Sequence, residues 1–256
     1  MYMYRSKKAV MAIIIVLLIS ASFALPAHAI MLVSRSQEVQ IGKQVEQDVI
    51  RQSGGLSQDP NLVSRVDRVG RIVAARSPRR DVTYTYRVLN SNVINAYAAP
   101  GGPVLITKGL VQILPTDDEL AFVLAHETGH IAAQHGRDAI NRSLLASGLA
   151  SILFGGASNT VQMGISIMYT LYNRGYSRSQ EYQADTYGVQ MMTNSGYNPE
   201  GAVKALAKLG TQRPGGINKY FSTHPAVPDR INRVSQASGI SPERQQALVR
   251  QAQAER

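Results

Sequence analysis

Cysteine is absent from this chain of 256 residues. The protein therefore has no disulfide scaffold, no thiol nucleophile and no lipid-anchored cysteine. Charged residues make up only 17% of the chain and apolar residues 44%, a balance that excludes an intrinsically disordered protein. The net charge is +10, but the basic residues are scattered and no aromatic residues alternate with them, which argues against nucleic-acid binding. Peripheral contact with an anionic membrane surface agrees better with this charge.

Long apolar runs are absent after the first thirty residues. The stretch 144–172 is mostly apolar, yet glycine and polar residues interrupt it before it reaches eighteen residues. It therefore predicts core or interfacial helices rather than a membrane crossing. There is no repeat of the tetratricopeptide kind and no low-complexity tract, so we expect one domain over residues 30–256.

The N-terminus has the pattern of an export signal. Basic residues at positions 5, 7 and 8 precede the apolar run "MAIIIVLLIS", and the small residues Ala27 and Ala29 follow it. This order predicts a signal peptide over residues 1–29 and a mature chain that starts at Ile30 in the periplasm. The alternative is an uncleaved anchor in the inner membrane, although the apolar stretch is slightly short for a span.

The remaining elements follow from periodicity and turn signals. Helical spacing predicts amphipathic helices over 36–53 and 61–75. "DVTYTYRV" (81–88) alternates as a half-buried strand, and two short apolar runs flank "PGGP" (100–103), so we expect a small antiparallel sheet. Further helices are expected at 179–194, 199–209, 228–237 and from Pro242 onward. The predicted fold class is α+β and mostly helical.

Three of the five histidines lie in "LAHETGHIAAQHG" (124–136). Thr116 and Glu119 stand at the spacing of a capping box, which predicts a helix that begins at Thr116 and is buried all round. On this helix His126 and His130 project side by side and can bind one zinc ion. Glu127 lies about 60° from His130, beside the metal, where its carboxylate can take a proton from a zinc-bound water. The alternative is a buried helix with two satisfied core histidines.

His135 does not fit the position of a third ligand. A known zincin pattern requires glycine at 133 and histidine at 136, whereas this chain has Ala133 and Gly136. If the helix continues, His135 points away from His126. We therefore expect His135 to lie near the helix end without binding the metal.

"SRSQEYQADTYG" (177–188) supplies two carboxylates one helical turn apart. Glu181 can be the third ligand, and Asp185 can orient a ligating histidine from outside the ligand set. The alternative is a solvated acidic face paired with Arg178.

Four motifs in order, "NAYAAPGG", "HETGH", "EYQAD" and "STHPAVPDR", resemble the gluzincin-type metallopeptidase family M48. This family includes the HtpX heat-shock protease, periplasmic assembly-enhancing proteases and CAAX prenyl endopeptidases. The similarity runs from about Ser36 to Ala237. It implies a zincin-like domain with a central helix bearing the motif His-Glu-x-x-His, and one zinc ion per chain.

The resemblance also implies a role for each site residue. His126, His130 and Glu181 bind zinc, Glu127 is the base and Asp185 supports the site. The segment Asn95, Ala96, Tyr97 and Ala98 lies along the substrate cleft. His224 reaches the active site, where it stabilises the oxyanion or occupies the site as a switch, although a lone histidine before proline is equally typical of a turn. Arg230, on the same segment, is expected to make only structural ion pairs.

The chain also departs from its relatives, because it lacks the membrane helices of the HtpX and CAAX members and the tetratricopeptide domain of the assembly-enhancing members. We expect a zinc metalloendopeptidase that hydrolyses misfolded or misassembled envelope proteins. The alternative is a zinc-stabilised, chaperone-like binding protein with little proteolysis. The sequence does not indicate the oligomeric state.

Overall fold

The computed structural model describes residues 32–146, 150–211, 219–224 and 227–255. The predicted signal peptide lies outside these residues. Three strands form one sheet: β1 (Thr85–Leu89), β2 (Ala96–Ala98) and β3 (Pro103–Thr107). The described helices are α2 (Arg35–Gln52), α3 (Pro60–Ala74), α4 (Lys108–Gln112), α5 (Asp117–Ala132), α6 (His135–Ala146), α7 (Ala150–Arg174), α8 (Arg178–Asn194), α9 (Glu200–Thr211), α10 (Tyr220–Thr223), α11 (Val227–Ala237) and α12 (Pro242–Ala254).

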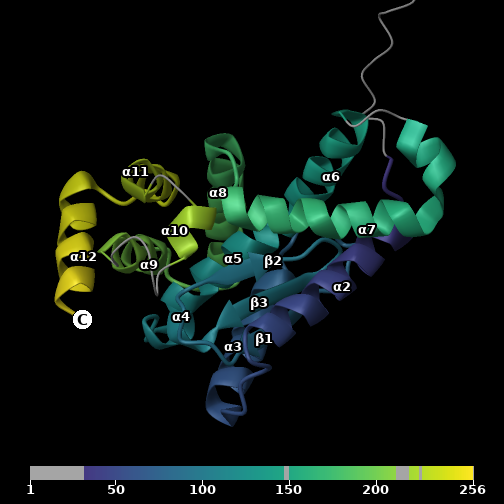
Figure 1. Ribbon diagram of the computed structural model, residues 1–256. Coiled ribbons are helices and arrows are strands. Elements are labelled where there is room, and N and C mark those ends of the chain that lie inside the picture. Colours follow the sequence, from purple (N-terminus) through teal and green to yellow (C-terminus); the bar gives the residue numbers. More distant parts are fainter. Residues whose placement is uncertain (1–31, 147–149, 212–218, 225–226, 256) are drawn as a thin grey trace, which may run out of the picture. The chain divides into compact units, whose positions relative to one another are not determined.

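The sheet is small and mixed, with the strand order β1-β3-β2 (Figure 1). β2 and β3 are antiparallel, as expected for two strands joined by the "PGGP" turn, but β1 pairs with β3 in parallel. β1 also begins at Thr85 rather than at Asp81. The alternation of apolar and polar residues that begins at Asp81 therefore includes residues that are not paired with another strand. β2 is an edge strand, because β3 alone pairs with it among the described residues.

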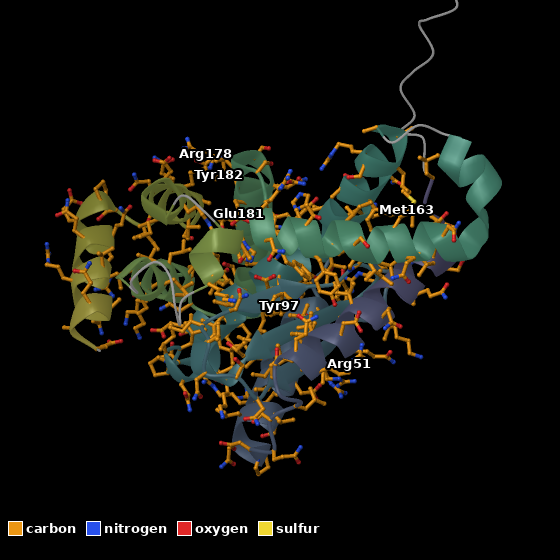
Figure 2. All side chains as sticks on the ribbon, in the orientation of Figure 1. Arg51, Tyr97, Met163, Arg178, Glu181 and Tyr182 are labelled. Carbon is orange, nitrogen blue, oxygen red and sulfur yellow. The ribbon has the colours of Figure 1, made fainter. Side chains whose placement is uncertain are left out.

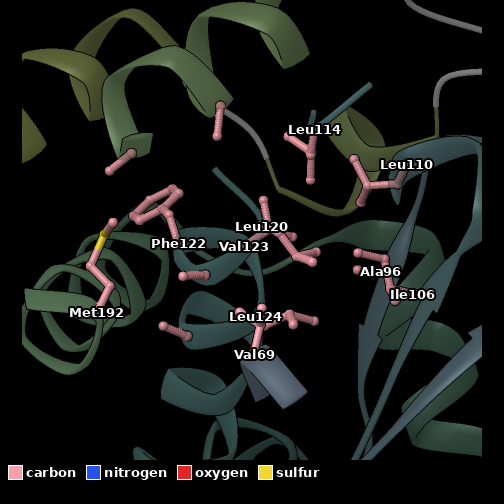
Figure 3. Close-up of a cluster of buried hydrophobic side chains, with 14 of the residues drawn as sticks. Val69, Ala96, Ile106, Leu110, Leu114, Leu120, Phe122, Val123, Leu124 and Met192 are labelled. Carbon is pink, nitrogen blue, oxygen red and sulfur yellow. The ribbon is translucent and has the colours of Figure 1, made fainter. Parts of the chain in front are cut away.

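α5 forms the centre of the core. Thr116 caps the helix by accepting a hydrogen bond from the amide of Glu119, and every residue from Glu119 to Ile131 is buried. Its apolar residues join one cluster with side chains from α3, the sheet, α8 and α9 (Figure 3). In Figure 1, α5 lies between the sheet and α8. The predicted buried helix is confirmed, and it gives the histidine motif a rigid support.

α8 approaches α5 very closely because small residues line the contact. A Cβ atom at Gly129 would lie 3.0 Å from the Ala184 carbonyl oxygen and 3.1 Å from the Tyr187 Cβ. A Cβ at Gly188 would lie 3.4 Å from the backbone of His126. The two glycines therefore allow a short interhelical distance, which brings the acidic face of α8 against the histidines of α5.

The other predicted helices are confirmed with boundaries close to those expected, whereas α4, α6 and α10 were not predicted. α4 and α10 are very short and carry little periodic signal. Among the residues that the structure describes, none of the helices combines the length and the apolar character needed to span a bilayer.

A buried ionic cluster connects α2 to the rest of the fold. Glu38 is 1% exposed and accepts hydrogen bonds from both terminal nitrogens of Arg79, at 2.8 and 2.7 Å. Arg79 also donates to the carbonyl of Ile131 near the end of α5, and the amide of Gly101 donates to Glu38. α2 thus holds both the loop after β2 and the end of the histidine-bearing helix.

The close packing of α2 against the loop after β2 generates a stability prediction at Gly42 of α2. A Cβ atom there would lie 1.7 Å from the carbonyl oxygen of Pro100. Helix propensity alone would make Gly42→Ala stabilising by about 1 kcal/mol, but the overlap should instead lower the free energy of unfolding by about 1–3 kcal/mol. Urea denaturation measures the difference. Gln47→Ala, at an exposed position of the same helix, is the control and should change stability by less than about 0.5 kcal/mol; a stabilised Gly42→Ala variant would contradict the packing described.

Candidate metal centre

Four side chains from three parts of the chain meet at one point. His126 and His130 come from α5, Glu181 comes from the first turn of α8, and His224 follows α10. One ligand atom from each lies within 4.8 Å of the others, and all four residues are buried. Figure 2 shows Glu181 on α8 close to α10. The structure therefore brings together the predicted ligands and the predicted active-site histidine.

The spacing of the donor atoms suits one small cation. The Nε2 atoms of His126 and His130 are 3.1 Å apart, and Nε2 of His130 lies 3.4 Å from Oε1 of Glu181. Nδ1 of His224 lies 3.3 Å from Nε2 of His126. Ligands at about 2.0–2.1 Å from a tetrahedral zinc ion are about 3.3–3.4 Å apart. Nitrogen and carboxylate donors in this number and spacing fit zinc.

Local sequence explains how each donor reaches this point. The two histidines of α5 are four residues apart, so they share one face of the helix. Ser177 and Gln180 form a capping box that starts α8, and this start places Glu181 in the first turn. Asp185 follows one turn later on the same face. Both acids are buried, at 0% and 3% exposure, which excludes the alternative of a solvated acidic face.

Arg230 of α11 lies between these two acids and is fully buried. Its Nε and NH2 atoms donate to the two carboxylate oxygens of Asp185 at 2.8 and 2.7 Å. Its NH1 atom is 2.8 Å from Oε2 of Glu181, so Oε1 of Glu181 is left to face His130. Sequence analysis indicated only structural ion pairs for Arg230, because nothing in "HPAVPDR" showed that both acids would lie within its reach.

Arg230 keeps Asp185 ionised, and His224 together with Arg230 keeps Glu181 ionised. Burial by itself raises the pKa of Asp185, but Arg230 outweighs burial and lowers that pKa to about 2. Burial likewise raises the pKa of Glu181, and the charges of His224 and Arg230 lower it well below its usual range. Oδ1 of Asp185 lies 3.0 Å from Nδ1 of His126. It therefore accepts the proton on Nδ1 of that ring and leaves Nε2 as the donor atom.

Glu127 lies beside the four donor atoms, as expected. Its side chain is 0% exposed, and neither carboxylate oxygen has a hydrogen-bond partner among the residues that the structure describes. The nearest charged neighbour is His224, with Nε2 3.4 Å from Oε1 of Glu127. A buried carboxylate that accepts no hydrogen bond is unfavourable in a purely structural role. Its position suits a group that accepts a proton from a bound water.

His224 is buried and ordered by stacking rather than lying in an exposed turn. Its ring stacks on Tyr220 with centroids 4.4 Å apart, and its Nδ1 lies 3.0 Å from Oε1 of Glu181. Burial lowers the pKa of His224, but the carboxylates of Glu181 and Glu127 outweigh burial and raise it. His224 thus bridges the ligand group and the base.

The expectation for His135 was wrong in its direction. α5 ends at Ala132, Gln134 has a left-handed φ of 59°, and α6 begins at His135. This break turns the chain, so that Nδ1 of His135 lies 2.8 Å from Nδ1 of His130 instead of pointing away. His135 is not part of the group of four donors. Burial lowers the pKa of His130 and of His135, which favours two neutral rings.

The segment 95–98 lies next to the site. Asn95 is buried, and its Oδ1 accepts from the amide of Ala96 and lies 3.5 Å from Oγ1 of Thr223, the residue before His224. Tyr97 packs edge-on against Tyr172 with ring centroids 5.2 Å apart. The hydroxyl of Tyr172 donates to the carbonyl of Ala98. Sequence analysis missed this tyrosine, which comes from α7 and fixes the end of β2.

Comparisons with known proteins agree with this geometry. The chain matches the model of "Peptidase family M48" over residues 57–238. It is 30% identical to the mitochondrial metalloendopeptidase OMA1 of Arabidopsis thaliana, over 64% of this chain and 34% of that protein. It is 28% identical to the metalloprotease LoiP of Escherichia coli (strain K12), over 58% and 60% of the two chains. It is also 28% identical to the beta-barrel assembly-enhancing protease of Yersinia pestis, over 72% and 40%. The matched region thus spans between 34% and 60% of the length of these curated relatives.

The position of Arg230 generates a second prediction. Arg230→Met leaves two buried carboxylates without their common cation, and it should lower the free energy of unfolding of the metal-free protein by about 3–5 kcal/mol. Urea denaturation measures this loss. Arg233→Met is the matched control on the same helix, because Arg233 is exposed and lies over the Tyr182 ring at 4.2 Å. That variant should lose about 0.5–1 kcal/mol, and equal losses would contradict the role of burial between the two acids.

Proposed function

Because the family match covers more than half of the chain, the protein belongs to peptidase family M48, and on this basis we propose that it is a zinc-dependent metalloendopeptidase. The observation that carries the proposal is the convergence of His126, His130 and Glu181 beside the buried carboxylate of Glu127, whose oxygens accept no hydrogen bond from the described residues. Two histidines and one carboxylate are the protein ligands of many catalytic zinc sites, which keep a further position open.

In this mechanism His126, His130 and Glu181 would hold one zinc ion per chain. Bound there, zinc would supply Lewis acidity toward the scissile carbonyl and would lower the pKa of a bound water. Glu127 accepts the proton of the attacking water and then donates it to the leaving amine, in the manner of a general base that becomes a general acid. The absence of a hydrogen-bond donor to Glu127 among the described residues supports this role, because neither oxygen is engaged in such a bond when the proton arrives.

We propose two uses for His224. Its Nδ1 lies at the fourth corner of the donor group, so the ring can occupy the site when no substrate is bound. When the ring turns away from the ligands, its position beside Glu127 lets it donate a hydrogen bond to the oxyanion that forms on the substrate. The short helix α10 and the stacking on Tyr220 hold the ring close to both positions.

The edge strand β2 is the proposed substrate contact. An extended polypeptide can add to a sheet edge through backbone hydrogen bonds, which do not require a particular sequence. The Ala96 amide and the Ala98 carbonyl, which bond to the side chains of Asn95 and Tyr172, would exchange these partners for the substrate backbone. Asn95 to Ala98 lie along this edge and next to the segment that carries His224. This arrangement favours unfolded or misassembled proteins as substrates, because their backbone groups are available for pairing.

We propose that these substrates are proteins of the cell envelope and that the protein acts in the periplasm. The predicted signal peptide supports this location, and one relative is named for enhancing β-barrel assembly. N-terminal sequencing of the protein from a periplasmic extract should give Ile30 as the first residue. An intact Met1 in the membrane fraction would instead favour the anchored form.

A second candidate function, a zinc-stabilised binding protein of the chaperone type, has less support. A purely structural zinc site gains nothing from a carboxylate beside an open position, and a buried carboxylate that accepts no hydrogen bond destabilises the fold. Digestion of casein by the exported, purified protein separates the two functions. The endopeptidase should cleave casein, lose this activity with a zinc chelator and regain it when zinc is added. Absence of cleavage by the zinc-loaded protein would favour the binding protein.

Glu127→Gln gives the sharpest test of the mechanism. The amide cannot accept the proton of the water, while the three proposed ligands remain in place. We expect stoichiometric zinc and a loss of turnover of at least about 100-fold. Metal content and casein cleavage should be measured on one preparation, so that lost zinc is not mistaken for lost catalysis. Turnover close to that of the wild type would remove Glu127 from its role.

A further inference from the structure

Three side chains, His130, His135 and Gln183, contact one another in series from the metal centre outward. Nδ1 of His130 lies 2.8 Å from Nδ1 of His135, and Nε2 of His135 lies 3.0 Å from Oε1 of Gln183 on α8. His135 is 3% exposed, whereas Gln183 is exposed. The break at Gln134 creates this series of contacts, because a continuous helix would direct residue 135 away from residue 130.

The contact with Gln183 determines where the protons lie on the two imidazole rings. The amide oxygen of Gln183 can only accept, so the proton of a neutral His135 sits on Nε2. Nδ1 of His135 then carries a lone pair and must accept from His130. The proton of His130 therefore sits on Nδ1, and its Nε2 presents a lone pair toward His126 and Glu181, as a metal ligand requires.

The opposite arrangement would disable the site. If His135 carried its proton on Nδ1, it would donate to Nδ1 of His130, and the proton of a neutral His130 would have to lie on Nε2. A protonated Nε2 cannot bind a metal ion. The contact between the two rings therefore selects which nitrogen of His130 is available, and it does so without a charged group.

We propose that His135 is a positioning residue, which holds His130 in the tautomer and orientation that bind the metal, with Gln183 fixing the proton on His135. This inference rests on the metal centre proposed above. His130 would thus receive from a neutral imidazole the support that His126 receives from the carboxylate of Asp185.

Zinc affinity tests this inference, measured by competition with a graded chelator on the wild type, His135→Ala and His135→Asn. Loss of a partner behind a ligating histidine typically weakens metal affinity about 10–100-fold, and we expect a loss in that range for His135→Ala. The Asn side chain can place its Oδ1 near the position of the imidazole Nδ1 and accept the same proton. His135→Asn should therefore bind zinc within about 5-fold of the wild type, by the same reasoning on ligand support.

The two variants separate positioning from packing. Both remove the imidazole and its bond to Gln183, so a role in packing alone predicts equal losses of affinity, and equal losses would overturn the proposal. Wild-type affinity in His135→Ala would overturn it as well. If the wild type binds no zinc, the proposed metal centre itself is wrong and this inference falls with it, whereas a zinc-binding wild type with an unaffected His135→Ala removes only the inference.

Substitutions at Gln183 provide an independent test of the proposal. Gln183→Glu keeps an acceptor at the outer end, whereas Gln183→Lys replaces it with a donor that opposes the required proton order. We expect Gln183→Lys to bind zinc more weakly than Gln183→Glu. Gln190→Glu and Gln190→Lys, at an exposed position of the same helix, control for the added charge. An equal difference between the two Gln190 variants would show that charge alone explains the result and would overturn this part of the proposal.

Discussion

The guanidinium of Arg230 lies between the carboxylates of Glu181 and Asp185 with no exposure to solvent, and the rest of the candidate site depends on this buried charge. Burying an ionised carboxylate without a cation lowers the free energy of unfolding by several kcal/mol, or the carboxylate becomes protonated. Because arginine does not release its proton, both acids stay ionised. One carboxylate can then face the donor atoms of α5, while the other accepts from His126.

The two histidines proposed as ligands have unequal surroundings. His126 lies against an ionised carboxylate and near a guanidinium, whereas His130 lies between His135 and the ring of Tyr176, with centroids 3.8 Å apart. A charged acceptor makes an imidazole a stronger electron donor than a neutral acceptor does. The two nitrogens at the metal centre are consequently not equivalent, although both come from one turn of one helix.

Sequence analysis predicted the parts of the site that follow from regular helical geometry. The four-residue spacing of the histidines in α5 and of the acids in α8 was sufficient for this. It failed where the backbone departs from regular geometry or where distant segments meet. Gln134 adopts a left-handed conformation without being glycine. No local sequence signal therefore marked the break between α5 and α6, which turns the side chain of His135 toward His130. The contacts of Arg230 and the parallel pairing of β1 with β3 depend on segments far apart in the chain, which periodicity does not describe.

Two ionic contacts join residues outside the region of family similarity to residues inside it. The family match covers residues 57–238, yet Glu38 and Glu255 lie outside it and pair with Arg79 and Lys208, two largely buried cations inside it. A fragment trimmed to the region of similarity would carry two basic side chains deprived of one counter-ion each. Inside the matched region Arg79 would keep only Asp81 and Lys208 only Glu119 as an acidic partner. The helix α2 and the end of α12 therefore complete ionic contacts of the folded unit that the region of family similarity does not include.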